Sequence, residues 1–162
     1  MKSSGGNAFS AMRQSAALYA AAASSIYAAS MARFSEGEKS GAFPKKDSRE
    51  FNEIIGGFMG AVVLHAFSIE LALKALCVKR GVAYPKTHDL AELFRSLLGD
   101  DRAAAAKGYD DKHPNSKGGL QGLLKSNAKA FEQWRYHYQY KPRTMACEEL
   151  ATAFDEIYAL SK

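Results

Sequence analysis

The sequence contains few of the residues that build metal sites or disulfide frameworks. Only two cysteines occur, Cys77 and Cys147, and neither has another Cys or a His at ligand spacing. This excludes a zinc motif, so we expect two buried thiols in a reducing, cytoplasmic compartment. A glycine-rich phosphate loop and a catalytic triad are absent as well. The sequence therefore predicts neither a metal nor a cofactor.

Acidic residues are missing from the first 35 positions, which contain Lys2, Arg13 and Arg33 among many Ala and Ser. Transit peptides have this composition, but the helical spacing of the apolar residues favours a retained helix. The whole chain carries a net charge of +5 with a pI of about 9.2. A mildly basic protein can contact nucleic acid, and a basic surface without any partner is an equally good interpretation.

A membrane span is not expected, although the run from Ile54 to Val78 is apolar enough to suggest one. The run carries His65, Glu70 and Lys74, and charges inside a bilayer are costly. A buried central helix explains it better. The 162 residues fit one domain, residues 1–162, with 1–6 as a frayed tail.

Strand-like alternation, internal repeats and linkers are also missing, and the apolar residues recur at helical spacing. We therefore predict an all-α fold, an antiparallel up-and-down bundle of four to five helices. Residues 100–119 are expected to form a polar loop with one or two helical turns. The expected helices run from Asn7 to about Phe34, from Arg49 to Lys79, from a Thr87 cap to Gly99, from Leu120 to before Pro142, and from about Thr144 onwards.

Two features predict how the long helices pack. Gly56, Gly57 and Gly60 weaken the second helix, and they allow a close helix contact or a kink. The first helix has a seam with several small residues, over which a neighbouring helix can approach closely. The seam consists of Phe9, Met12, Ala16, Tyr19, Ala23, Ile26 and Ser30.

Glu70 and Lys74 stand four residues apart on the most apolar helix. One interpretation is an ion pair on a solvated strip, worth a few tenths of a kcal/mol. The other is that both side chains face a cleft, where a partly desolvated carboxylate needs a cationic partner. His88 precedes the third helix, and it either bonds a loop carbonyl or joins a functional site.

The segment from Trp134 to Arg143 is the most unusual in the chain, because aromatic residues alternate there with Arg, His and Lys. Basic groups bind phosphates and aromatic faces stack on unpaired bases, so this composition suits single-stranded nucleic acid. The alternative is that Trp134 and Tyr138 are core residues and the other tyrosines cover the helix end.

Several short motifs in register resemble the HEPN superfamily, most closely over residues 57–140. They are the run from Ser68 to Leu76, then Gly81, then Thr87-His88-Asp89-Leu90, then Phe131-Glu132-x-Trp134-Arg135-Tyr136. The resemblance implies a helical bundle that dimerises. In active members the dimer cleft holds a metal-independent ribonuclease site. There an Arg stabilises the phosphorane charge, and a His that follows after four to six intervening residues moves the proton of the attacking 2′-hydroxyl.

The sequence departs from that signature, because no Arg is followed by a His at this spacing. Arg135 and His137 project about 200° apart on a regular helix and cannot share a face. Tyr140 stands where the His would be, and a phenol is a poor base near neutral pH. His137 serves only if the helix unwinds before Pro142; otherwise His88 supplies the imidazole from another helix.

The expected catalytic residues are therefore Arg135, His137 and Tyr140, with Glu70, Lys74, His88 and Tyr136 lining the pocket. Arg135 should pair with the carboxylate of Glu70 there. We expect an RNA-directed module of a bacterial defence or toxin–antitoxin system, either a variant ribonuclease or an inactive RNA or nucleotide binder. The partners would be a second copy of the chain, with the interface near Tyr136 to Arg143, and a cognate antitoxin or nucleotidyltransferase. The alternative is a structural or protein-interaction bundle without a nucleic-acid role.

Overall fold

The computed structural model describes residues 4–130 and 146–162. This part of the chain forms six helices and no strand, which confirms the all-α prediction. The helices are α1 (Ser4–Ser40), α2 (Arg49–Arg80), α3 (Leu90–Arg95), α4 (Gly99–Lys112), α5 (Gly119–Ser126) and α7 (Cys147–Leu160).

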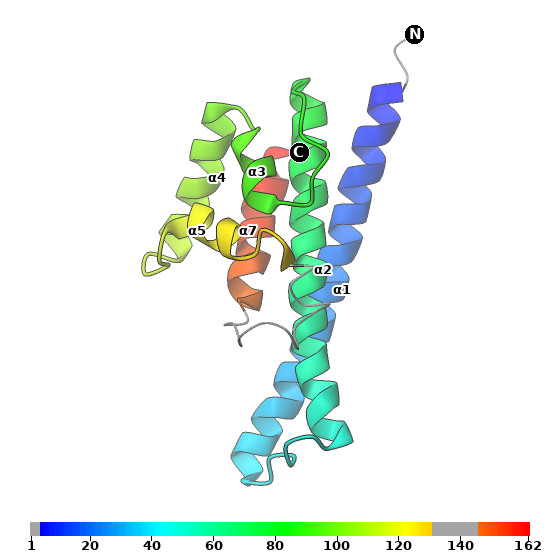
Figure 1. Cartoon of the computed structure of the whole chain (residues 1–162), viewed down its shortest axis with the longest axis vertical. Helices are drawn as coiled ribbons and strands as arrows, with labels where there is room; N and C mark the ends of the chain where they lie inside the picture. Colours follow the sequence, from blue (N-terminus) through cyan, green and yellow to red (C-terminus); the bar gives the residue numbers. More distant parts are fainter. Residues whose placement is uncertain (1–3, 131–145) are drawn as a thin grey trace.

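Helices α1 and α2 form a long antiparallel hairpin, and α3, α4, α5 and α7 gather beside the later part of α2 (Figure 1). The limits of α2 follow from local chemistry. The Ser48 hydroxyl accepts a hydrogen bond from the Phe51 amide at 3.2 Å and caps the start. Gly81, with φ of 67°, adopts the left-handed conformation that ends the helix. Both limits lie within one residue of the prediction.

Helix α2 is the core element of the fold. It is the one described helix that is long and apolar enough to cross a membrane, yet 67% of its most apolar window is buried in the fold. A lipid-facing helix would not bury this surface against its own chain. The burial is that of a core helix, as the charges within the run predict.

The packing of α1 against α2 confirms the predicted close contact between the two long helices. A Cβ on Gly57 would collide with the Ser30 hydroxyl, so this glycine permits the close helix contact. A Cβ on Gly56 or Gly60 would meet open space. Tyr19 and Ile26 lie at the edge of the seam. The Tyr19 ring lies 6.0 Å from the ring of Phe67 on α2, and Ile26 lies beside Gly57, although the two side chains are 42% and 36% exposed. The neighbouring Ala20, which the predicted seam leaves out, is buried in the core.

The third helix is shorter than predicted. Asp89, not Thr87, is its N-cap, and its carboxylate accepts a hydrogen bond from the Glu92 amide at 2.9 Å. Leu90, Leu93, Phe94 and Leu97 are buried, but Leu98 is exposed because α3 has ended and α4 begins.

Helix α4 replaces most of the loop that the polar composition of residues 100–119 predicts. Tertiary contacts explain the difference. Tyr109 and Ala105 are buried in the core, and Asp101 forms two hydrogen bonds to Arg80, at 2.9 and 3.0 Å. These contacts outweigh the weak amphipathicity of the segment.

Helix α5 begins at Gly119, where the Asp110 carboxylate accepts a hydrogen bond from the Leu120 amide at 3.0 Å. Phe131 and Trp134, predicted on the same helix, lie outside the described residues. Helix α7 buries one apolar face, with Cys147, Leu150, Phe154 and Ile157 in the core and Tyr158 stacked on Phe154. Both cysteines are free and buried, as predicted.

Candidate functional site

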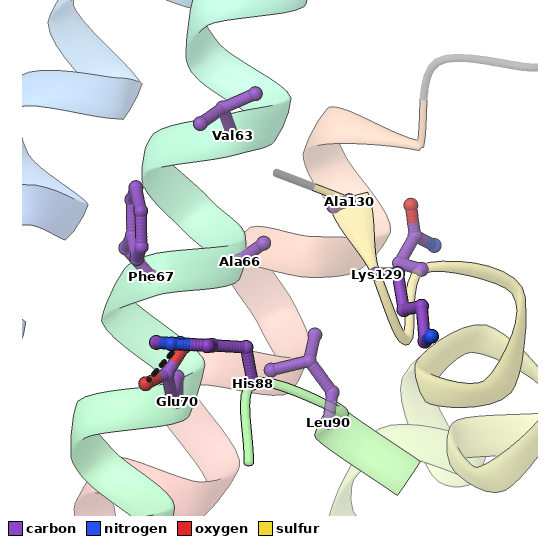
Figure 2. A pocket seen from close by; sticks show the side chains of 9 residues that line it. Val63, Ala66, Phe67, Glu70, His88, Leu90, Lys129 and Ala130 are labelled. Carbon is purple, nitrogen blue, oxygen red and sulfur yellow. Dashed lines mark hydrogen bonds and ion pairs between the residues drawn. The ribbon is translucent and has the colours of Figure 1, made fainter. Parts of the chain in front are cut away.

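Glu70, Lys74 and His88 form one cluster between α2 and the connection that leads to α3. Lys74 Nζ lies 2.6 Å from Glu70 Oε1, and His88 Nδ1 lies 3.1 Å from both Glu70 oxygens. Figure 2 shows the His88 ring lying over the Glu70 carboxylate, with dashed lines joining them. The structure thus brings together the three pocket residues predicted in its described part.

The exposure of the three side chains differs widely, and this decides between the two interpretations of the ion pair. Glu70 and Lys74 are only 8% and 15% exposed, whereas His88 is 74% exposed. The pair therefore does not lie on a solvated strip. A carboxylate this far from water needs compensation, and it has two nitrogen partners. The loop-carbonyl interpretation of His88 is wrong, because its Nδ1 bonds Glu70.

Local hydrogen bonds hold His88 in its position. The Thr87 hydroxyl accepts a hydrogen bond from the Asp89 amide at 3.1 Å, which closes a tight turn around His88. The following Leu90 amide donates to the Ala128 carbonyl at 3.2 Å. Since Leu90 is also buried, the backbone on the C-terminal side of His88 is tied to the core.

A small pocket of about 30 Å³ lies beside the cluster, which is enough for a water-sized group. Its walls are mostly apolar, with polar groups at Glu70, His88, Asn127 and Lys129 (Figure 2). Asn127 and Lys129 belong to no sequence motif, and only the return of the chain after α5 brings them near α2, so the sequence did not predict them in the pocket. The apolar lining residues are Val63, Ala66, Phe67, Leu90 and Ala130.

Other titratable groups in the described residues are buried and have shifted pKa values. Burial lowers the pKa of His65 to about 4, and its Nδ1 has no hydrogen-bond partner among the described residues. Burial raises the pKa of the Cys147 thiol to about 11, so the thiol stays protonated near neutral pH and is a poor nucleophile. Burial, followed by the hydrogen bond to Glu148, raises the pKa of Tyr27 to about 12.

The predicted residues Arg135, Tyr136, His137 and Tyr140 lie outside the described residues. The pairing of Arg135 with Glu70 therefore stays a prediction. Ala130, which lies five positions before Arg135 in the sequence, lines the same pocket as Glu70. Within residues 4–130 and 146–162, no group of three or more His, Cys, Asp or Glu could hold a metal ion.

Comparison with known proteins gives one finding. Residues 56–112, about a third of the chain, match the family model described as HEPN domain. The match confirms the resemblance over most of α2, over α3 and over α4, and it includes Glu70, Lys74 and His88. No curated protein and no solved structure matches the chain.

Proposed function

We propose that this protein is an RNA-directed HEPN-type module that binds single-stranded RNA at the Glu70–Lys74–His88 cluster. The observation that carries the proposal is that the cluster falls inside the stretch that matches the HEPN domain, where it combines a desolvated ion pair with an exposed imidazole. A purely structural ion pair has no need of a third, exposed partner.

The chemistry of the cluster suits a polyanionic chain with unpaired bases. The imidazole of His88 can stack on a base or bond a phosphate, and Lys129 adds positive charge at the pocket. Arg135 would add a planar guanidinium able to pair with Glu70 and still face a phosphate. The adjoining aromatic segment, with Tyr136, would supply further stacking surfaces.

The cellular role proposed for this module is bacterial defence or toxin–antitoxin activity, with a cognate antitoxin or nucleotidyltransferase as the protein partner. Coexpression with the product of the adjacent gene tests this role. A cognate partner would bind the protein and change its action on RNA. A neighbour that neither binds the protein nor changes RNA binding would count against the toxin–antitoxin role.

Binding of a fluorescent, unstructured RNA by the full chain tests the RNA-directed function. We expect affinity to fall steeply as salt rises, because Lys and Arg release counterions from the phosphates. Arg135→Ala and Lys74→Ala should weaken binding at least tenfold. Lys107→Ala is the matched control, since Lys107 also forms an i, i+4 ion pair, with Asp111, but on an exposed face. This variant should bind like the wild type.

The competing function is a structural or protein-interaction bundle. A fold held together by helix packing suits such a role as well. It predicts no binding to any single-stranded RNA even at low salt. Salt-independent binding, or an equal loss of affinity in Lys107→Ala and Lys74→Ala, would show that the cluster is not the RNA site.

A further inference from the structure

We propose that the Glu70–Lys74–His88 cluster binds a phosphate only when His88 is protonated, so that the ligand and a proton bind together. This inference rests on the proposed RNA-directed function and adds to it the regulation of the same site by pH. The negative charge of Glu70 and the positive charge of Lys74 form an ion pair, with Nζ and Oε1 2.6 Å apart. With a neutral His88, the cluster therefore carries no net charge.

Burial confines the charge of Lys74 to this ion pair. The side chains of Glu70 and Lys74 are only 8% and 15% exposed, so little water screens their attraction. A phosphate that approached the ammonium would also approach the carboxylate, whose negative charge repels it. Lys74 therefore compensates Glu70, and the net attraction for a phosphate has to come from His88.

The hydrogen bonds of His88 show which form of its ring can bind a phosphate. An ionised carboxylate only accepts hydrogen bonds, so Nδ1 carries the proton that is shared with both Glu70 oxygens at 3.1 Å. In the neutral ring Nε2 then has a lone pair, and it cannot donate to a phosphate oxygen. In the imidazolium Nε2 carries a proton and donates. Since 74% of the side chain is exposed, a phosphate can approach the ring.

The charges around His88 favour the imidazolium once a phosphate is bound. The charged residues near it are Glu70 and Lys74 on α2, Lys86 and Asp89 on its own connection, and Lys129 at the pocket after α5. Asp89 caps α3 through the Glu92 amide, whereas Glu70 contacts the His88 ring. A bound phosphate places the ring between two anions, which stabilise its positive charge. Histidine changes its charge between about pH 5 and pH 8, so proton uptake falls in this range.

Binding of a fluorescent oligouridylate by the full chain at fixed salt tests the coupling, because this RNA keeps its charge over the same range. The affinity of the wild type should fall about tenfold from pH ~5.5 to pH ~7.5, because protonated His88 becomes scarce. His88→Ala should bind weakly at both pH values. Calorimetry in two buffers of different ionisation enthalpy should detect proton uptake by the wild type and none by His88→Ala.

His113→Ala is the matched control, because it removes a histidine whose Nε2 bonds Thr152 on α7, away from the cluster. It should keep the pH dependence of the wild type once thermal unfolding shows that it is folded at both pH values. His65, with a pKa of about 4, stays neutral at pH ~5.5 and does not contribute.

Glu70→Gln separates the charge effect from a loss of structure. The amide still offers an oxygen to Lys74 and His88, but the cluster then carries one net positive charge. This variant should bind the RNA more tightly than the wild type at pH ~7.5 and depend less on pH. Weaker binding by a folded Glu70→Gln would contradict the proton-linked site.

Equal affinity of the wild type at the two pH values would overturn this inference while the proposed function stands. The same holds if His88→Ala keeps the pH dependence of the wild type. A wild type that binds no RNA at either pH would overturn both.

Discussion

At the scale of single residues, the burial of His65 makes its charged form unfavourable in the folded protein. Its side chain lies in the middle of α2 and is only 2% exposed, and within the described part of the chain its Nδ1 has no hydrogen-bond partner. Burial disfavours the charged imidazole, which lowers its pKa from 6.5 to about 4. His65 is therefore neutral in the folded protein at neutral pH, whereas His88 is exposed and bound to a carboxylate.

His65 should make the fold sensitive to acid. The pKa of His65 is lower in the folded protein than in the unfolded chain. The contribution of neutral His65 to stability is therefore fully present above pH 6.5, and it is lost as pH falls towards 4. Near pH ~4.5 this loss is about 2.5 kcal/mol. Between neutral pH and pH ~4.5, the free energy of unfolding should fall by about 2.5 kcal/mol less in His65→Leu than in the wild type. Urea unfolding at the two pH values measures this difference. Equal losses in the two proteins would contradict the assignment.

At the scale of elements, the contact between α1 and α2 depends on one glycine. The Ser30 hydroxyl occupies the space where a Cβ on Gly57 would stand, and Ser30 Cβ itself would lie 3.3 Å away. Both residues lie in the tightly packed part of the hairpin, where added volume costs stability. Gly60, less than one turn later, has open space around its Cα.

Two alanine substitutions should therefore change stability in opposite directions. Gly60→Ala should stabilise the protein by up to about 1 kcal/mol, because alanine is the better helix former. Gly57→Ala should destabilise it by about 1 kcal/mol, since overpacking outweighs the same gain. Adding Ser30→Ala to Gly57→Ala should recover the loss. Chemical denaturation measures all three, and a stabilising Gly57→Ala would show that the helices can separate freely.

At the scale of the whole molecule, the outer face of α1 is apolar where the fold does not cover it. The Leu18 side chain is 65% exposed, and no charged residue occurs between Arg13 and Arg33. The hairpin of α1 and α2 extends beyond the other helices at the end where residues 41–48 join the two helices (Figure 1). Such a surface is suited to contact with another chain.

We expect the protein to be a homodimer of 35.2 kDa, twice the chain mass of 17.6 kDa. Light scattering at micromolar concentration measures this mass. Leu18→Glu places a charge on the apolar face of α1, and it should yield a monomer if that face forms the interface. A persistent dimer would favour the interface predicted near Tyr136 to Arg143. A monomeric wild type would contradict the dimer itself.

Local patterns in the sequence determine much of this protein. The helical period and the absence of strand patterns predict the fold class, because each helix must bury one apolar face. Ser48 and Gly81 set the ends of α2, because capping acts on backbone groups within a few residues. Glu70 and Lys74 are paired by their i, i+4 spacing alone.

Only the tertiary structure decided the rest. His88 reaches Glu70 across 18 positions because the turn after α2 folds back on that helix. The polar segment at 99–112 is a helix because Asp101 pairs with Arg80 and Tyr109 fills the core. Tyr19 and Ile26 lie beside α2 as the seam predicts, yet they stay 42% and 36% exposed, whereas Ala20 is buried. Periodicity shows that a helix has an apolar side, but the elements that pack against it determine which residues are buried.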